Sequence, residues 1–317
     1  MLFSTTSGIK RRTESEGSEA VSRKRKTSRF LKAIWRFAFH VYGRLLPFGF
    51  GRIVAPLVAW PLHLFGLRRR VAETNLGLAF PETSVSSRRR IARKSLQNLL
   101  AVYLEIPRLR YMNESELRRH FRITNLELLT DPEIDHRGGL LLSAHLGNWE
   151  LLAIGSARLS GREFSVIVKG QNDFDELEQT RTAFGNSVIP LHRAALRASR
   201  TLASGGVVAM LADQSAPAQE LPVTFFNHST TAFSTPARLA LRYRPKVVAG
   251  FTLREKGGGY QVRLVEIGHE DLDDTPEGVA LFTRRYLDLL ESVIREYPEE
   301  WVWQHRRWKR SPGVDYG

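Results

Sequence analysis

The sequence predicts an α/β fold in which a mainly parallel sheet is flanked by helices. Two observations carry this prediction: short apolar runs of strand length recur along the chain, and segments with helical periodicity separate them. The strands are expected at 139–144, 164–169, 187–190, 207–212, 246–253 and 260–265. The helices are expected at 88–106, 148–159, 173–184, 193–204 and 276–297.

Composition excludes several kinds of site and indicates the kind of partner that the protein binds. The 317-residue chain contains no cysteine, which excludes disulfides, zinc–thiolate sites and a cysteine nucleophile. Its formal net charge of +14 requires an anionic partner such as nucleic acid, an anionic membrane or a phosphorylated lipid. No zinc-finger spacing or RNA-binding signature is present, and long apolar stretches accompany the basic residues, so a membrane surface is favoured.

The chain divides into three parts. Residues 1–30 contain eight Lys or Arg and three Glu with few apolar residues, and they are expected to form a disordered basic tail. Residues 31–70 are rich in Phe, Leu and Trp and are expected to form a membrane-associated helical segment. Residues 71–317 are expected to form the α/β domain.

The apolar segment at 45–67 is long enough to cross a bilayer, which needs roughly 20 apolar residues. However, Pro47, Pro56 and Pro61 interrupt a straight helix, and Arg52 is costly near the bilayer centre. These residues favour a monotopic or dipping helical element over a clean span. The alternative is a buried helical hairpin of a soluble domain.

The candidate for catalysis is His145, in the run His145-Leu146-Gly147-Asn148-Trp149-Glu150. A second His-x4-acid spacing, His269 to Asp274, has no apolar flank and is expected in a solvated loop. His145 instead follows a predicted buried strand and precedes a predicted helix. Sites in open α/β sheets gather at the carboxyl ends of strands, so position favours His145.

If His145 lies on the loop before the helix, Glu150 in the first helical turn can reach back to the imidazole. A carboxylate there would fix the tautomer and stabilise the imidazolium, making His145 a general base. The alternative is a histidine that caps a core helix.

Three further clusters are candidates on position. Arg181 lies in a polar helix, where an arginine is usually solvated, and Asp213-Gln214 ends a predicted strand, where Asp is often a cap. In the C-terminal run, Trp301, Trp303 and Trp308 alternate with Arg306, Arg307, Lys309 and Arg310. This pattern is typical of an interface between lipid tails and phosphates, and also of stacking on single-stranded nucleic acid.

Taken in order, these residues resemble the bacterial lipid A biosynthesis acyltransferases of the lysophospholipid acyltransferase superfamily. The similarity covers roughly residues 70–312. The matching motifs are Asn75-Leu76 with Phe80-Pro81-Glu82, Ser143 to Glu150, Arg181, Asp213-Gln214, Phe225-Phe226, Thr235 to Ala240, and Trp303 to Lys309.

The resemblance implies a glycerolipid acyltransferase-like fold and a membrane-bound enzyme on the cytoplasmic face of the bacterial inner membrane. His145 would take a proton from a hydroxyl of a phosphorylated glycolipid, with Glu150 as its orienting partner. The oxygen would attack the thioester of an acyl carrier protein or coenzyme A, so the nucleophile comes from the substrate. No metal, organic cofactor or nucleic acid is implied. The supporting residues would be Asn148, Arg181, Asp213, Gln214, Arg238, Arg306, Arg307 and Lys309.

Departures from the family pattern leave the acceptor open. The segment from Asp213 to Phe226 is short, and Asn227-His228 replaces the usual small residues. A lipid A precursor is the first expectation, and another glycolipid such as a phosphatidylinositol mannoside is the second. A non-catalytic basic protein that binds membranes or nucleic acid is the third.

Overall fold

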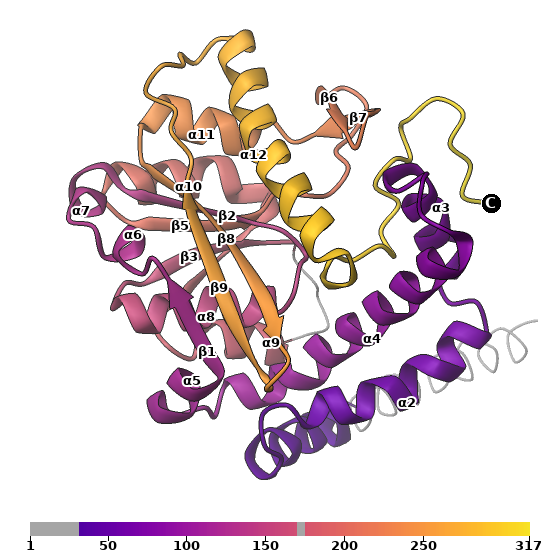
Figure 1. The fold of residues 1–317 in the computed structure, drawn as a ribbon. Coiled ribbons are helices and arrows are strands. Elements are labelled where there is room, and N and C mark those ends of the chain that lie inside the picture. The colour runs from indigo at the N-terminus through magenta and orange to yellow at the C-terminus, as the bar shows by residue number, and fades with distance from the viewer. Residues whose placement is uncertain (1–31, 170–174) are drawn as a thin grey trace, which may run out of the picture.

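A computed structural model describes residues 32–169 and 175–317, and the predicted basic tail at 1–30 lies outside these residues. A seven-stranded sheet in the order β1-β9-β8-β2-β5-β3-β4 forms the centre (Figure 1). Every neighbouring pair is parallel except β8 and β9. The strands are β1 (Phe121–Thr124), β2 (Gly139–Ser143), β3 (Phe164–Val168), β4 (Ser187–Pro190), β5 (Val207–Leu211), β8 (Lys246–Glu255) and β9 (Gly259–Glu266).

The predicted fold class, a mainly parallel sheet flanked by helices, is confirmed. The longer helices are α2 (Phe50–Leu64), α3 (Arg69–Ala79), α4 (Val85–Leu109), α8 (Trp149–Ser160), α9 (Asp175–Thr182), α10 (Ala194–Ala203), α11 (Thr235–Tyr243) and α12 (Pro276–Glu296). Shorter ones are α5 (Glu114–His120), α6 (Glu127–Thr130), α7 (Glu133–Arg137) and the 3-10 turns η1 (Leu191–Arg193) and η2 (Pro298–Glu300). Helix α4 was expected to end at Pro107 but continues to Leu109, so the proline, which cannot donate a backbone hydrogen bond, does not end the helix.

Helices cover both faces of the sheet. The alternation of side chains along β2 sends Leu140 and Leu142 into one apolar core and Leu141 into the other. The first core is closed by α3, α10, α11 and α12, and the second by α5, α6, α7 and α8. Strand β2 is therefore buried on both sides, which explains its continuous apolar sequence.

Sequence reasoning missed a small hairpin made of β6 (Leu221–Phe225) and β7 (His228–Ala232). Its two-residue turn places Phe226 at φ 49° and Asn227 at φ 62°. Two successive positive φ values are the requirement of a tight hairpin turn, and asparagine tolerates them well. The departure at Asn227 is thus explained by turn geometry.

The N-terminal region forms a helix over residues 32–45 followed by α2, and α2 lies alongside α4 (Figure 1). The buried side of α2 presents Gly51, Ala55 and Ala59. A Cβ atom at Gly51 would lie 2.8 Å from the Leu104 Cβ atom, so the two backbones approach closely. The small residues at four-residue spacing therefore explain how α2 packs on the α/β domain.

Arg52, which was expected to disfavour a membrane span, points into the protein interior. Its Nη2 atom donates to the Gly259 carbonyl at 2.7 Å, and its Nε atom lies 3.5 Å from Glu105 Oε1. Arg254 Nη1 lies 3.6 Å from the same oxygen, and the Tyr260 hydroxyl donates to Glu105 Oε2 at 2.6 Å. A buried carboxylate on α4 thereby joins α2 to strands β8 and β9.

The described residues contain no single helix that is long and apolar enough to cross a membrane. The pair α2 and α3 passes a length and composition test together, but the two helices are bent by 94°.

The tryptophans near the C-terminus lie in the core, so the prediction that they face lipid is wrong. Trp301, Trp303 and Trp308 are at most 2% exposed. They pack edge to face with one another and against Phe225 and Phe226 of the hairpin. Burying these large apolar rings stabilises the fold more than exposing them to solvent. Each indole N–H also donates to a hydrogen-bond acceptor inside the protein.

We expect Glu105→Gln to lower the free energy of unfolding by about 3 kcal/mol, because it leaves Arg52 and Arg254 buried beside too little negative charge. Urea titration followed by circular dichroism measures this loss. The matched control Glu114→Gln, at an exposed ion pair, should cost less than about 1 kcal/mol. Equal losses in the two variants would contradict a stabilising role for the buried carboxylate.

Candidate active site

His145 lies on the loop between β2 and α8, as the sequence predicted. Asn148 caps α8: its Oδ1 atom accepts from the Leu151 amide at 2.9 Å, and its Nδ2 atom donates to Glu105 at 2.8 Å. The helix therefore begins after the histidine, and the imidazole is free of helical geometry. Asn148 is buried and supports the loop.

The C-terminal segment holds this loop in place. The Gly147 amide donates to the Glu300 carbonyl at 3.0 Å, and the Val302 amide donates to the His145 carbonyl at 3.0 Å. Gly147 has φ +59°, and a Cβ atom there would lie 1.9 Å from the Thr252 carbonyl oxygen. Only glycine fits this turn, which explains why glycine follows so closely after the histidine.

The carboxylate that contacts His145 is Asp213, two residues beyond β5. Asp213 Oδ1 lies 2.8 Å from His145 Nδ1, and Asp213 Oδ2 accepts from the His145 backbone amide at 3.0 Å. Trp301 Nε1 donates to the same Oδ2 atom at 2.9 Å. The aspartate is buried, so one carboxylate joins the ends of two adjacent strands to the C-terminal segment.

This geometry sets the protonation state of the pair. Burial opposes ionisation of Asp213, but the charge of His145 and the three hydrogen bonds hold its pKa at about 2. The ionised carboxylate can only accept, so Nδ1 carries a proton, and Nε2 is the nitrogen that has a lone pair when the imidazole is neutral. Burial opposes the imidazolium, yet the charge and hydrogen bond of Asp213 outweigh it and raise the pKa of His145 above its ordinary value.

The prediction that Glu150 orients the imidazole differs from the structure. Both carboxylate oxygens of Glu150 are bonded to Arg181, at 2.7 Å from Nε and 2.5 Å from Nη2. Glu150 lies in the first turn of α8, and its side chain meets α9, which carries Arg181. Glu150 still acts on His145 through space, because its charge is among the causes that raise the pKa of the imidazole.

Two polar side chains complete the surroundings of the imidazole. Gln214 Nε2 lies 3.3 Å from His145 Nε2 and 3.5 Å from Nδ1. His305, which sequence reasoning did not select, accepts from the Ser215 amide through Nε2 at 3.4 Å. Burial lowers the pKa of His305 to about 4, so it stays neutral near pH 7. The imidazole of His145 is 24% exposed and remains reachable.

The four predicted cationic residues outside this cluster take other positions. Arg307 is fully buried and donates to Thr230 Oγ1 and the Thr231 carbonyl, both at 2.9 Å, so it cannot meet a phosphate at the surface. Arg238 lies 3.8 Å from Asp274, which precedes the N-terminal end of α12. Trp301, which contacts Asp213, follows the C-terminal end of the same helix, so Arg238 is placed at the other end of α12 from this cluster. Arg306 and Lys309 are exposed.

The N-terminal motif around Asn75 supports the same C-terminal segment. Asn75 Nδ2 donates to the carbonyls of Trp303 and His305, both at 2.7 Å, and Phe80 packs on Trp303. Tyr316 donates to Asn75 Oδ1 at 2.6 Å. Motifs more than 200 residues apart therefore form one structural unit behind the histidine.

The second His-x4-acid spacing, His269 to Asp274, was expected in a solvated loop, and the structure differs at His269. His269 is in a loop but only 1% exposed, and its ring packs edge to face on Phe282. The apolar cover comes from α12, which the local sequence does not reveal.

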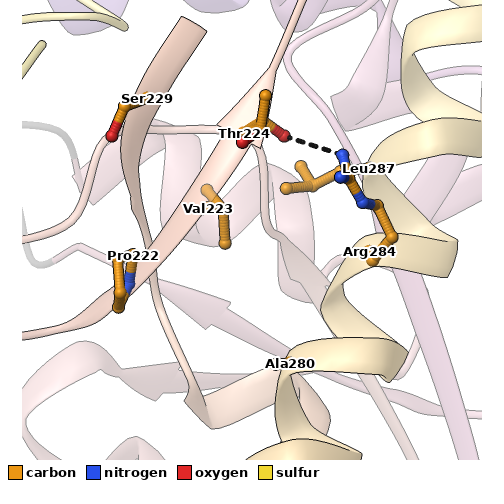
Figure 2. Close-up of a pocket in the computed structure, with 7 residues that line it drawn as sticks. All are labelled: Pro222, Val223, Thr224, Ser229, Ala280, Arg284 and Leu287. Carbon is orange, nitrogen blue, oxygen red and sulfur yellow. Dashed lines mark hydrogen bonds between the residues drawn. The ribbon is translucent and has the colours of Figure 1, made fainter. Parts of the chain in front are cut away.

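A separate pocket of about 310 Å³ lies between the β6–β7 hairpin and α12 (Figure 2). Its one charged lining residue, Arg284, donates to the Thr224 carbonyl at 3.4 Å. None of its lining residues contacts His145 or Asp213. The pocket therefore contributes no group to the candidate active site.

Comparisons with known proteins decide the family. The model of the bacterial lipid A biosynthesis acyltransferases matches residues 7–310. The chain belongs to this family. As a lipid A biosynthesis acyltransferase, it is an enzyme, so the non-catalytic alternative is set aside.

Individual relatives are distant but cover most of the chain. The lipid A biosynthesis lauroyltransferase of Escherichia coli (strain K12) is 25% identical, over 79% of this chain and 82% of its own. The lipid A biosynthesis palmitoleoyltransferase of the same strain is 22% identical, over 77% and 80%. A phosphatidylinositol mannoside acyltransferase of Mycolicibacterium smegmatis is 22% identical, over 69% and 72%.

We expect the acyltransferase to lose activity as pH falls through the raised pKa of His145, because the base must be unprotonated. Asp213→Asn removes the charge that raises this pKa, so the acid limb of kcat/KM should move to lower pH. Activity above the limb should fall by about 100-fold or more, because the tautomer is no longer fixed.

The pH dependence of kcat/KM measures both effects, and Asp288→Asn at an exposed site serves as the control. An acid limb that stays in place in the folded Asp213→Asn variant would contradict the pairing of the two side chains.

Proposed function

We propose that the protein transfers a fatty acyl chain from an acyl thioester to a hydroxyl of a lipid A precursor. The observation that carries the proposal is the His145–Asp213 pair, in which Asp213 Oδ1 lies 2.8 Å from Nδ1 and the imidazole is reachable. Membership of the family supports the reaction class.

In this mechanism His145 Nε2 takes the proton of the acceptor hydroxyl as that oxygen attacks the thioester carbonyl. The C–O bond forms, and the carbonyl oxygen becomes an oxyanion. Collapse of this intermediate breaks the C–S bond, and the thiolate takes the proton from the imidazolium. Asp213 stabilises that imidazolium throughout, because its charge and hydrogen bond are already in place.

The neighbouring polar groups have proposed roles as well. The Gln214 amide, 3.3 Å from Nε2, is placed to donate to an oxygen that approaches the imidazole. Arg181 keeps its bidentate contact with Glu150, and the two charges act on the imidazole in opposite directions: Glu150 raises the pKa of His145 and Arg181 lowers it. Arg306 and Lys309 are exposed and remain candidates for phosphate binding.

The acceptor has one specific alternative. The similarity to a phosphatidylinositol mannoside acyltransferase favours another glycolipid as the second candidate. Both acceptors are glycolipids that offer a hydroxyl, and the same base serves both. The acyl donor is a thioester of a carrier protein or of coenzyme A.

We further propose that the enzyme sits on the cytoplasmic face of the bacterial inner membrane through its N-terminal helices. On α2, Ile53, Leu57, Trp60 and Leu64 follow one another at helical spacing and are 59–73% exposed. On the helix over 32–45, exposed apolar residues recur in the same way: Ile34, Phe37, Val41 and Leu45. This outward stripe is the apolar face of a monotopic element.

Basic residues border the apolar stripe. Arg68, Arg70 and Arg93 are exposed at the start of α3 and on the N-terminal half of α4. Burial and the charges of Arg69 and Arg93 lower the pKa of His63 near the end of α2, which indicates how near these cations lie. An apolar stripe with a cationic border suits anionic phospholipid headgroups.

We expect cells that produce the wild-type protein to contain a glycolipid heavier by one acyl chain than cells without it. His145→Ala should abolish this mass difference, because no base remains to activate the acceptor. Mass spectrometry of extracted lipids provides the readout, and circular dichroism tests whether the variant is folded. His136→Ala, at an exposed histidine of α7, is the control. Continued acylation by His145→Ala would exclude the mechanism, and a shift confined to mannosides would select the second acceptor.

The triple variant Leu57→Ser, Trp60→Ser, Leu64→Ser should bind vesicles of phosphatidylethanolamine and phosphatidylglycerol about tenfold or more weakly than wild type. Vesicle flotation with the full chain measures binding. The control variant Val85→Ser, Leu281→Ser changes equally exposed apolar side chains elsewhere and should bind normally. Unchanged binding by the triple variant would show that this stripe does not contact the membrane.

A further inference from the structure

A second surface of distinct chemistry lies on η1 and α10. Its exposed side chains are Leu191, His192, Arg193, Leu196, Arg197 and Arg200, here called the α10 face. Helix α10 buries only Ala194, Ala198 and Leu202, so most of its surface faces outward. The chain contains no Asp or Glu from residue 179 to residue 212.

The arginines of this face have no acidic partner among residues 32–169 and 175–317: no ion pair there involves Arg193, Arg197 or Arg200. Many other surface arginines are paired, for example Arg285 with Asp271 and Arg263 with Glu296. The α10 face therefore offers a cluster of exposed cations together with two exposed leucines.

The N-terminus of α10 lacks the capping side chain and the acidic residues that helices usually have there. No side chain caps its N-terminus, and His192 and Arg193 lie there with no acidic residue in the first turn. The helix dipole favours negative charge at this end, so the Arg193 cation does not stabilise the helix. Local preferences are most often broken where a surface serves binding.

The sheet register brings this face to the level of the active site. Strand β3 pairs Val168 with Pro190, and it pairs Val166 with Ala209 of β5. Continuing that register sets Leu191 level with Ala212, next to Asp213. Strand β4 is two strands away from β5, which places η1 about 10 Å from the end of β5. The α10 face therefore begins at the same carboxyl edge as His145.

We propose that the α10 face docks an acidic carrier protein that delivers the acyl thioester. Acidic side chains of the carrier would pair with Arg193, Arg197 and Arg200, and a small apolar patch would cover Leu191 and Leu196. The proposal rests on the proposed function, since it names the donor for the same site. Charge complementarity of this kind mainly increases the rate of encounter and fixes orientation.

The face is poorly suited to membrane insertion. It carries two large apolar side chains, whereas the N-terminal stripe carries eight at helical spacing on two adjacent helices. The cations of the α10 face lie between its leucines, so inserting the leucines would bring the guanidinium groups toward the hydrocarbon. An aqueous acidic protein avoids this cost, because its carboxylates meet the cations directly.

The experiment compares two donors with the full chain in detergent micelles. One is an acyl chain on holo acyl carrier protein, and the other is the same acyl chain on free pantetheine, which lacks protein and charge. The charge-reversal variant Arg193→Glu, Arg197→Glu should raise KM for the carrier-bound donor at least about tenfold with little change in kcat. Transfer from acyl-pantetheine should be unchanged. Arg119→Glu, Lys256→Glu makes the same charge change at exposed sites elsewhere and should leave both donors unaffected.

Fluorescence anisotropy with labelled acyl carrier protein tests docking without turnover. Weaker binding to the charge-reversal variant, and weaker binding to wild type as salt increases, would support the proposal. Equal carrier binding by wild type and variant would overturn it, as would a loss of carrier-independent transfer with KM for the carrier unchanged. Reduced vesicle binding with normal carrier binding would assign the face to the membrane. If wild type transfers no acyl chain from either donor but binds the carrier through this face, the proposed reaction fails and the docking surface stands.

Discussion

The buried carboxylate of Asp213 is the contact on which the site depends. It accepts hydrogen bonds from the backbone and side chain of His145 and from the Trp301 indole. These contacts join the ends of β2 and β5 to a segment that lies some 90 residues further along the chain. Because the carboxylate stays ionised with a pKa of about 2, the imidazole has one tautomer and one orientation. In the proposed mechanism this fixed orientation lets His145 act as a base.

Contacts from several other segments hold the residues around Asp213 in place. The C-terminal segment is held by Asn75 of α3, by Ser95 of α4, and by the aromatic residues of the hairpin. The cap of α8 is tied through Asn148 to Glu105, which also meets Arg52 of α2. The helix that carries the apolar stripe is therefore linked by a continuous set of polar contacts to the loop of His145. The proposed membrane surface and the proposed base share one scaffold.

The two outer surfaces differ in chemistry, and each suits a different substrate. The N-terminal helices expose apolar side chains and suit a lipid phase from which an acceptor can arrive. The α10 face exposes cations and suits an acidic protein arriving from water. Both surfaces belong to elements that reach the carboxyl edge of the sheet, where Arg36 of the 32–45 helix pairs with Glu176 of α9 at 2.6 Å. Two substrates of opposite solubility could then meet without sharing a route.

Much of this protein was determined by the sequence alone. Apolar periodicity placed the strands 139–144 and 207–212 and the long helix at 276–297, since burial on a sheet or along a helix leaves a local pattern. Strand ends selected His145 and Asp213, because parallel strands gather their carboxyl ends at one edge. The four-residue strand β1 and the β6–β7 hairpin were missed because such short segments carry little periodicity.

Only the tertiary structure decided which partners meet. Spacing along the chain suggested Glu150 for His145, but the pleat and the helix direction bring Asp213 to the imidazole and give Glu150 to Arg181. Composition suggested that Trp301 and Arg307 face lipid, yet the hairpin and α12 cover them. The sequence indicated that Arg52 is unfavourable in a membrane helix, and the structure shows that Glu105 provides a buried counter-charge for it. Local sequence specifies what a side chain can do, whereas packing between distant segments specifies what it contacts.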